Sequence, residues 1–202
     1  MSLGGRAVDR FLSRRRQQAR AAEEAGESAV GSIPRRAGGG PARLSFAQER
    51  LWFLDRLQPG SPAYNVPVGL GLRGSLDPAA LQAALDELVR RQAALRSRMS
   101  TLERDGELVP VQEAAPPAPL AVPLVDLTAL ADAPRRAEAR RVAVAEGRRP
   151  FVFEGAPLTR VRRVLLHDAE SLLLVVLHHA VADGWSVGSS RSGGAPASRR
   201  RQ

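Results

Sequence analysis

An uninterrupted apolar run, Leu172 to Leu177, that ends in two histidines constrains the fold of this chain more than any other feature. Six aliphatic residues are too few to cross a bilayer but enough for one buried strand. His178 and His179 follow, then three residues and the turn-forming pair Asp183-Gly184. We therefore expect a buried strand that delivers imidazoles to the edge of a site. The ordinary pKa of histidine suits proton transfer near neutral pH, which favours general-base chemistry.

Three further segments carry distinctive patterns. Segment 45–54 reads Ser-Phe-Ala-Gln-Glu-Arg-Leu-Trp-Phe-Leu, segment 91–99 reads Arg-Gln-Ala-Ala-Leu-Arg-Ser-Arg-Met, and segment 150–158 reads Pro-Phe-Val-Phe-Glu-Gly-Ala-Pro-Leu. Together with the later His-His-x-x-x-Asp-Gly motif, these segments resemble the motifs of non-ribosomal peptide synthetase condensation domains. That family belongs to the chloramphenicol acetyltransferase-like superfamily. The resemblance covers about residues 41–187, which correspond to the N-terminal lobe of a two-lobed domain.

Two of these segments depart from the family pattern. Gln92 and Ala93 stand where the family has His-Glu, and Val152 replaces an aspartate. One extra residue also precedes Pro157. The opening segment and the histidine motif therefore carry most of the resemblance.

The resemblance implies a condensation reaction in non-ribosomal peptide biosynthesis. In that reaction an amide bond forms between aminoacyl or peptidyl substrates held as thioesters on the phosphopantetheine arms of carrier proteins, and the domain binds no cofactor itself. By position, His179 is the expected base or amine-positioning residue, and His178 supports the loop. Asp183 is the expected structural aspartate, paired in the family with an arginine of the second lobe. Gly184 is expected to let the backbone approach the thioester or its arm.

Several alternatives stay open. Because one lobe supplies half of the family's substrate tunnel, we expect this chain to be inactive alone. It can instead be a non-catalytic half-domain that binds a carrier protein, completed by a second lobe in cis or in trans, or a stand-alone acyltransferase that uses coenzyme A thioesters. A metal site made of His178, His179 and Asp183 is disfavoured, because adjacent side chains of a strand diverge.

The charge is distributed in a way that argues against a nucleic-acid partner. The chain has a net charge of +9, but residues 44–187 contain 17 basic and 17 acidic side chains. The predicted domain therefore lacks the electrostatic footprint of a nucleic-acid-binding protein. The absence of cysteine excludes disulfides and thiolate metal sites. With neither a secretory signal nor a membrane-spanning run visible, we expect a cytoplasmic protein.

The chain divides into three parts by composition. Residues 1–40 are expected to be a disordered linker or docking segment, because Gly26 to Gly40 is rich in glycine. Residues 41–187 form the predicted lobe. Residues 188–202 have no large apolar side chain and are expected to be a disordered tail. Our hypothesis is that the reading frame is broken, or the gene truncated, near residue 188.

Alternating helical and strand patterns within residues 41–187 predict an α+β fold. We expect helices from Ser45 to Leu57, from Asp77 onward with Leu88 and Val89 in its buried stripe, and over residues 134–148. Strands are expected over residues 66–72 and 107–112, and a hairpin over 161–166 and 172–177. The glycines on one face of the 66–72 strand predict close backbone approach there.

Overall fold

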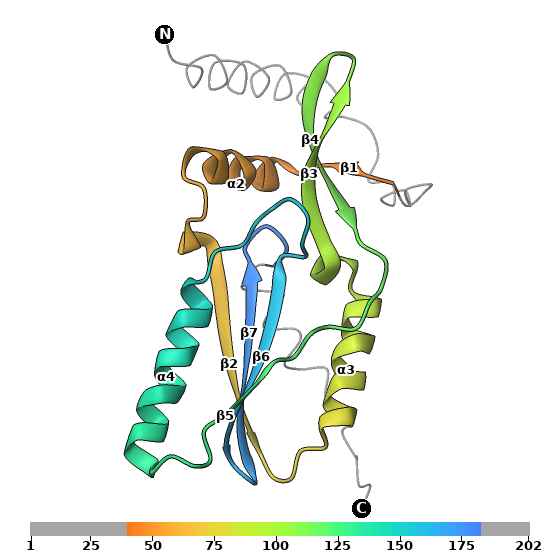
Figure 1. Ribbon diagram of the computed structural model, residues 1–202. Coiled ribbons are helices and arrows are strands. Elements are labelled where there is room, and N and C mark those ends of the chain that lie inside the picture. The colour runs from red at the N-terminus through yellow and green to blue at the C-terminus, as the bar shows by residue number, and fades with distance from the viewer. Residues whose placement is uncertain (1–39, 183–202) are drawn as a thin grey trace, which may run out of the picture. The chain divides into compact units, whose positions relative to one another are not determined.

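Two sheets and the helices that accompany them make up residues 40–182, the part of the chain that the computed structural model describes (Figure 1). Residues 1–39 of the predicted linker or docking segment and the predicted tail after residue 187 lie outside the described residues. The elements in chain order are β1 (Ala42–Arg43), α2 (Phe46–Leu57), the 3₁₀ helix η1 (Pro62–Tyr64), β2 (Asn65–Arg73), α3 (Pro78–Arg91), the 3₁₀ helix η2 (Ala93–Arg96), β3 (Ser97–Arg104), β4 (Glu107–Ala114), β5 (Leu124–Asp126), α4 (Asp132–Arg148), β6 (Thr159–His167) and β7 (Glu170–His178).

A four-stranded sheet in the order β2-β7-β6-β5 places the apolar run in an inner position. β7 pairs antiparallel with β2 on one side and with β6 on the other, while β5 runs parallel to β6. The strand predicted over residues 66–72 corresponds to β2, and the predicted hairpin corresponds to β6 and β7, so both predictions are confirmed. All three strands are longer than predicted. Because β7 has a strand on each side and packing on its faces, it can be apolar almost throughout.

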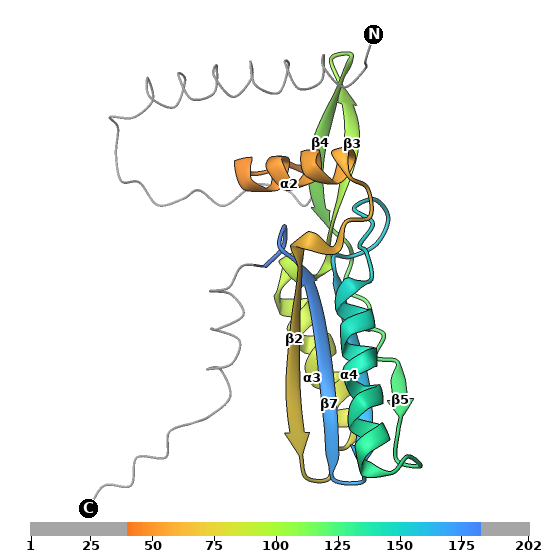
Figure 2. The same cartoon turned by 90° about the vertical axis from the view of Figure 1, so that its left-hand side faces the viewer.

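Helices α3 and α4 lie on opposite sides of this sheet (Figures 1 and 2). α4 packs against one face and forms with it what we call the helix-facing cluster, which consists of Leu127, Ala139, Val164 and Leu174. In α3, Val89 is 5% exposed but Leu88 is 40% exposed, so the prediction that both lie in a buried stripe was wrong for Leu88. The arrangement of helices and mixed sheets is α+β, as predicted.

Local capping signals set where two helices begin. Ser45 and Gln48 form a reciprocal capping box, in which the Gln48 amide N–H donates to Ser45 Oγ and the Ser45 amide N–H donates to Gln48 Oε1. Asp77 caps α3 by accepting from the amide N–H of Ala79. α4 begins at Asp132, two residues before the predicted start, and its N-cap Ala131 makes no side-chain bond.

A smaller sheet in the order β1-β4-β3 is built on a hairpin with a two-residue turn. Asp105 and Gly106 both have positive φ angles, 53° and 76°, which is the backbone of a type I′ turn. β3 was not predicted from the sequence. It begins within segment 91–99, which therefore connects the end of α3 to a strand whose Met99 is fully buried.

The glycine face of β2 differs from the prediction of close backbone approach. A Cβ at Gly71 would have nothing within 4 Å, and one at Gly69 would make ordinary contacts with Leu172 and Leu174. This face instead borders an open groove of about 660 Å³ between β2, β7 and α4. The glycines leave space there and do not permit a tight contact.

Candidate functional site

The two adjacent histidines lie at the end of β7 in opposite environments. His178 is the last residue of the strand and is 4% exposed, whereas His179 is exposed. The His178 amide N–H donates to Leu158 O at 3.0 Å, and the His179 amide N–H donates to Tyr64 O at 2.9 Å. Backbone bonds to neighbours on both sides therefore hold the point where the strand turns into the loop.

The buried imidazole of His178 is enclosed by aromatic rings. The centre of the Phe153 ring lies 4.8 Å from the centre of the His178 ring, and that of Phe151 lies 6.0 Å from it, both in edge-to-face geometry. The centre of the Tyr64 ring lies at 6.3 Å. Burial lowers the pKa of His178 to about 4, and the charge of the neighbouring His179 contributes to this lowering. His178 is therefore neutral near pH 7. Its Nδ1 accepts from the amide N–H of Ala180 at 3.1 Å, which assigns the ring proton to Nε2.

Gln48 connects the opening segment to the loop after the histidines. Its Nε2 donates to Ala180 O at 3.1 Å and to Gln112 Oε1 at 2.9 Å. Its Oε1 accepts from the amide N–H of Ser45 and from Gln112 Nε2. One amide thus links the start of α2, the strand β4 and the loop. Gln48 was not a predicted site residue, and its place in the opening segment was the signal that could have found it.

The ring of His178 rests on a cluster that brings distant segments together. The Phe153 carbonyl accepts from the amide N–H of Met99 at 3.0 Å, and the Leu158 amide N–H donates to Ser97 O at 3.2 Å. Segment 150–158 is thereby fixed between β3 and the end of β7. The residues of this site cluster are Leu44, Met99, Phe151, Phe153, Leu158, Val176 and Ala180.

A cavity of about 400 Å³ opens beside His178, on the side of α2. Burial raises the pKa of the Asp55 carboxyl on its wall, against a hydrogen bond from the Gly60 backbone and the charge of Arg56. The cavity combines apolar walls with one carboxyl and one neutral imidazole, and none of its lining except His178 was a predicted site residue. Its lining residues are Leu51, Leu54, Asp55, Leu57, Gln58, Ser61, Ala63, Tyr64 and His178.

Two of the four predicted site residues, Asp183 and Gly184, lie outside the described residues. The disfavoured metal site includes Asp183 and so lies partly outside them as well. Within residues 40–182, no group of three or more histidine, aspartate or glutamate side chains is placed to hold a metal ion. Over the same range, no helix is both long and apolar enough to cross a membrane.

Comparison with known proteins decides the family. The model of the condensation domain matches residues 40–189, which include all four motif segments. The chain belongs to the condensation-domain family. It is 45% identical over 145 residues to chondramide synthase of Chondromyces crocatus and 43% identical over 144 residues to a linear gramicidin synthase of Brevibacillus parabrevis. These matches cover 72% and 71% of this chain but 4% and 2% of the two synthases.

Solved structures agree with this assignment. The starter condensation domain of rhizomide synthetase, in a variant form, matches with a TM-score of 0.66 and 27% identity. The match covers 74% of this chain and 35% of that chain. The first condensation domain of the CDA synthetase matches with a TM-score of 0.62 at 24% identity, which supports the fold alone. The resemblance to non-ribosomal peptide synthetase condensation domains and the chloramphenicol acetyltransferase-like fold are both confirmed.

Proposed function

We propose that residues 40–184 supply the histidine side of an amide-forming acyltransferase site that joins two carrier-bound substrates. The observation that carries this proposal is the pair of environments at the end of β7. One imidazole is buried, neutral and bonded to its own loop, while the next one is exposed and can meet a substrate.

In the proposed reaction the acceptor's α-amine attacks the carbonyl carbon of the donor thioester. A C–N bond forms, the C–S bond breaks, and one amine proton is transferred in the end to the departing thiolate. An α-amine with a pKa near 8 is mostly protonated at neutral pH, so a base or a positioning acceptor lowers the barrier. His179 is exposed and takes this role, an effect worth about 10²–10⁴-fold for a well-placed general base.

His178 acts on the same loop without touching the substrate amine. The Nδ1 atom of His178 accepts a hydrogen bond from the Ala180 amide N–H, and the aromatic rings around the imidazole fix its orientation. Asp183 and Gly184 remain the proposed structural aspartate and backbone-approach residue of the loop.

The partners we propose are peptidyl carrier proteins, which deliver both substrates on phosphopantetheine arms. The chain spans about a third of the solved chains that it matches and 2–4% of the synthases named above. We therefore propose that turnover needs residues beyond those of this chain, supplied by a second lobe in cis or in trans, and that the 202-residue chain alone is inactive.

The test is amide formation from carrier-loaded donor and acceptor, followed by mass spectrometry. The 202-residue chain is assayed alone and as a chimaera in which residues 40–187 are joined to the remainder of a related condensation domain. We expect turnover by the chimaera only, and a loss of about 10²–10⁴-fold on His179→Ala. His167→Ala is the matched control, because it removes the third histidine side chain of the protein, which lies exposed at the far end of β6.

Each other outcome counts against part of the proposal. Turnover by the chain alone would overturn the need for further residues. Full activity of the His179→Ala chimaera would remove His179 from the reaction. Tight carrier binding by a chimaera that never turns over would instead favour the non-catalytic binding module.

A second candidate, acyl transfer from coenzyme A thioesters, is favoured by one observation. A doubly substituted variant of the rhizomide synthetase starter domain, 27% identical to this chain, has been solved in complex with C8-CoA and with C8-CoA together with Leu-SNAC. Offering the chimaera octanoyl-CoA and a carrier-loaded acyl donor at equal concentration separates the two candidates. Preferential consumption of octanoyl-CoA would support the starter reaction.

A further inference from the structure

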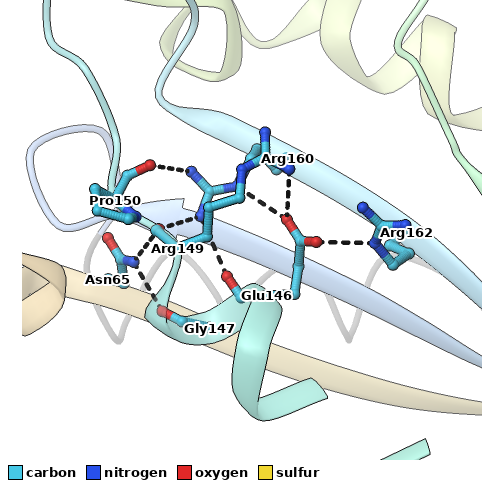
Figure 3. A network of polar contacts seen from close by, with 7 residues as sticks. All are labelled: Asn65, Glu146, Gly147, Arg149, Pro150, Arg160 and Arg162. Carbon is cyan, nitrogen blue, oxygen red and sulfur yellow. Dashed lines mark hydrogen bonds and ion pairs between the residues drawn. The ribbon is translucent and has the colours of Figure 1, made fainter. Parts of the chain in front are cut away.

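A buried ion network closes the C-terminal end of α4 (Figure 3). The Glu146 side chain is 7% exposed and accepts from Arg160 Nε at 3.1 Å and from Arg162 Nε at 2.8 Å. Burial would raise the pKa of this carboxyl, but the hydrogen bond from Arg162 and the charges of the surrounding arginines outweigh it and lower the pKa. Glu146 is therefore a buried carboxylate held between two guanidinium groups of β6.

Arg160 does more than pair with this carboxylate. Its Nη1 donates to Pro150 O at 3.1 Å, and its Nη2 donates to Arg149 O at 2.6 Å and to Glu146 O at 3.2 Å (Figure 3). The last carbonyls of a helix have no partners within the helix, so a side chain that collects them fixes the path of the chain at that point. Arg160 thus determines where the chain leaves α4 and enters segment 150–158.

The same guanidinium stacks on the aromatic ring that follows. Arg160 Cζ lies 3.7 Å from the centre of the Phe151 ring, within the range of a cation–π contact. Phe151 also contacts His178, whose ring it meets in edge-to-face geometry at 87°. Phe151 therefore lies between the fixed guanidinium and the buried imidazole.

His178 in turn organises the loop that carries His179. Its Nδ1 accepts from the Ala180 amide, and its carbonyl accepts from the Val181 amide at 3.0 Å. We propose that Arg160 is a positioning residue: by holding Phe151 against His178 it sets the orientation of the loop over residues 178–182. The contact geometry stands on its own, and only the consequence for amide formation rests on the proposed function.

The competing explanation is that Arg160 only stabilises the fold. Arg162 provides the matched control, because it donates to the other oxygen of the same buried carboxylate and, among the described residues, stacks on no aromatic ring of the site. Arg162→Met and Arg160→Met each remove one guanidinium from Glu146. Arg160→Met also releases Phe151 and removes the hydrogen bonds to the Pro150, Arg149 and Glu146 carbonyls, and Phe151→Leu separates these two losses.

The experiment uses the full 202-residue chain labelled with ¹⁵N-histidine and with ¹⁵N on the backbone. The chain has three histidines, so the ring signals of His178 can be assigned by single substitutions. Tautomer state, ring-current shifts of the His178 protons, and hydrogen exchange of the Ala180 amide are measured where circular dichroism shows each variant fully folded. None of these readouts depends on turnover.

In the wild-type chain we expect an unprotonated Nδ1 and a protected Ala180 amide. Arg160→Met should shift the His178 ring signals and raise exchange at Ala180 by about tenfold or more, while Arg162→Met changes it by less than about twofold. Phe151→Leu, which keeps every Arg160 hydrogen bond, should reproduce the rise in Ala180 exchange seen in Arg160→Met.

Equal effects of the two arginine variants on Ala180 would overturn the proposal and leave a purely structural role. Unchanged hydrogen exchange of the Ala180 amide in Phe151→Leu would also overturn it, because the aromatic contact would then transmit nothing to the loop. If the signatures change as expected but the chimaera shows no amide formation, the proposed function fails and the positioning role of Arg160 stands.

Discussion

The helix-facing cluster and the site cluster both use β7 but are assembled in different ways. The helix-facing cluster joins α4 to one face of β6 and β7, with Leu127 from the connection after β5. The site cluster joins the residue after β1, a methionine near the start of β3, two phenylalanines between α4 and β6, and the end of β7. One cluster is a helix on a sheet, and the other is a meeting point of separate segments.

The two clusters place different demands on the sequence. The helix-facing cluster needs only an apolar face on each element, and many sequences satisfy that need. The site cluster needs a ring at Phe151 and at Phe153, an imidazole at His178 and a carbonyl at Ala180 in defined positions. Substitutions can separate the contributions of the two clusters, beginning at Glu146, where the clusters are connected.

The largest effect is expected at Glu146, whose partners extend toward both clusters. Arg160 stacks on Phe151 of the site cluster. Arg162 lies on the same face of β6 as Val164 of the helix-facing cluster. Glu146→Gln leaves two poorly exposed guanidinium groups without their counter-charge and should reduce the free energy of unfolding by about 3–5 kcal/mol. Urea denaturation measures the change.

Glu87→Gln is the matched control for the charge change. Glu87 also pairs with two arginines, Arg90 and Arg91, but on the exposed surface of α3. Solvent screens these pairs, so we expect the unfolding midpoint to stay at the wild-type value. If both glutamate variants lose the same stability, burial is not what makes the Glu146 network important.

The next largest effect distinguishes the clusters by a pair of equal truncations. Leu158→Ala in the site cluster and Leu174→Ala in the helix-facing cluster each remove a buried leucine, and each should cost about 2–5 kcal/mol. Only Leu158→Ala should alter the ring signals of His178, because the Leu158 side chain belongs to the same buried cluster as Phe151 and Phe153, whose rings meet the His178 ring in edge-to-face geometry. Identical NMR changes in the two variants would mean that the clusters do not act separately.

How much was predictable from the sequence follows the same division. Periodicity predicted β2, the β6–β7 hairpin and α3, and capping residues predicted the starts of α2 and α3, because those signals lie within one element. β3 and the role of Phe151 were missed, because their burial depends on partners far along the chain, such as Phe153 for Met99. The roles of His178 and His179 came from the family resemblance and remain predictions.

A pH effect of intermediate size should arise at His178. Its pKa falls from an ordinary value of 6.5 to about 4 in the folded chain, so below pH 6.5 the unfolded chain takes up a proton that the folded chain resists. The neutral His178 imidazole contributes its full share to the free energy of unfolding above about pH 6.5. This contribution, about 2–3 kcal/mol, is lost as the pH falls toward 4. Urea denaturation between about pH 7 and pH 4 measures the slope.

Variants identify the source of that slope. His178→Asn should remove it, whereas His179→Gln should keep most of it, because burial is the larger cause of the lowered pKa and the neighbouring charge the smaller. A His178 imidazole that titrates near its ordinary pKa of 6.5 by NMR would show that the aromatic enclosure does not exclude water.

The smallest effect is expected at Gln48, where the site cluster is joined to α2. Gln48→Ala removes one half of the capping box and the hydrogen bond to Ala180 O, and should cost about 1–2 kcal/mol. Ser45→Ala removes only the other half of the capping box and leaves the Gln48 bond to Ala180 in place. Both variants should therefore fray the start of α2, but only Gln48→Ala should raise hydrogen exchange at Ala180 and Val181. Equal exchange in the two variants would show that the opening segment acts as a helix start alone. Faster exchange in Gln48→Ala would show that the opening segment and the histidine motif, 132 residues apart at this hydrogen bond, are parts of one structure.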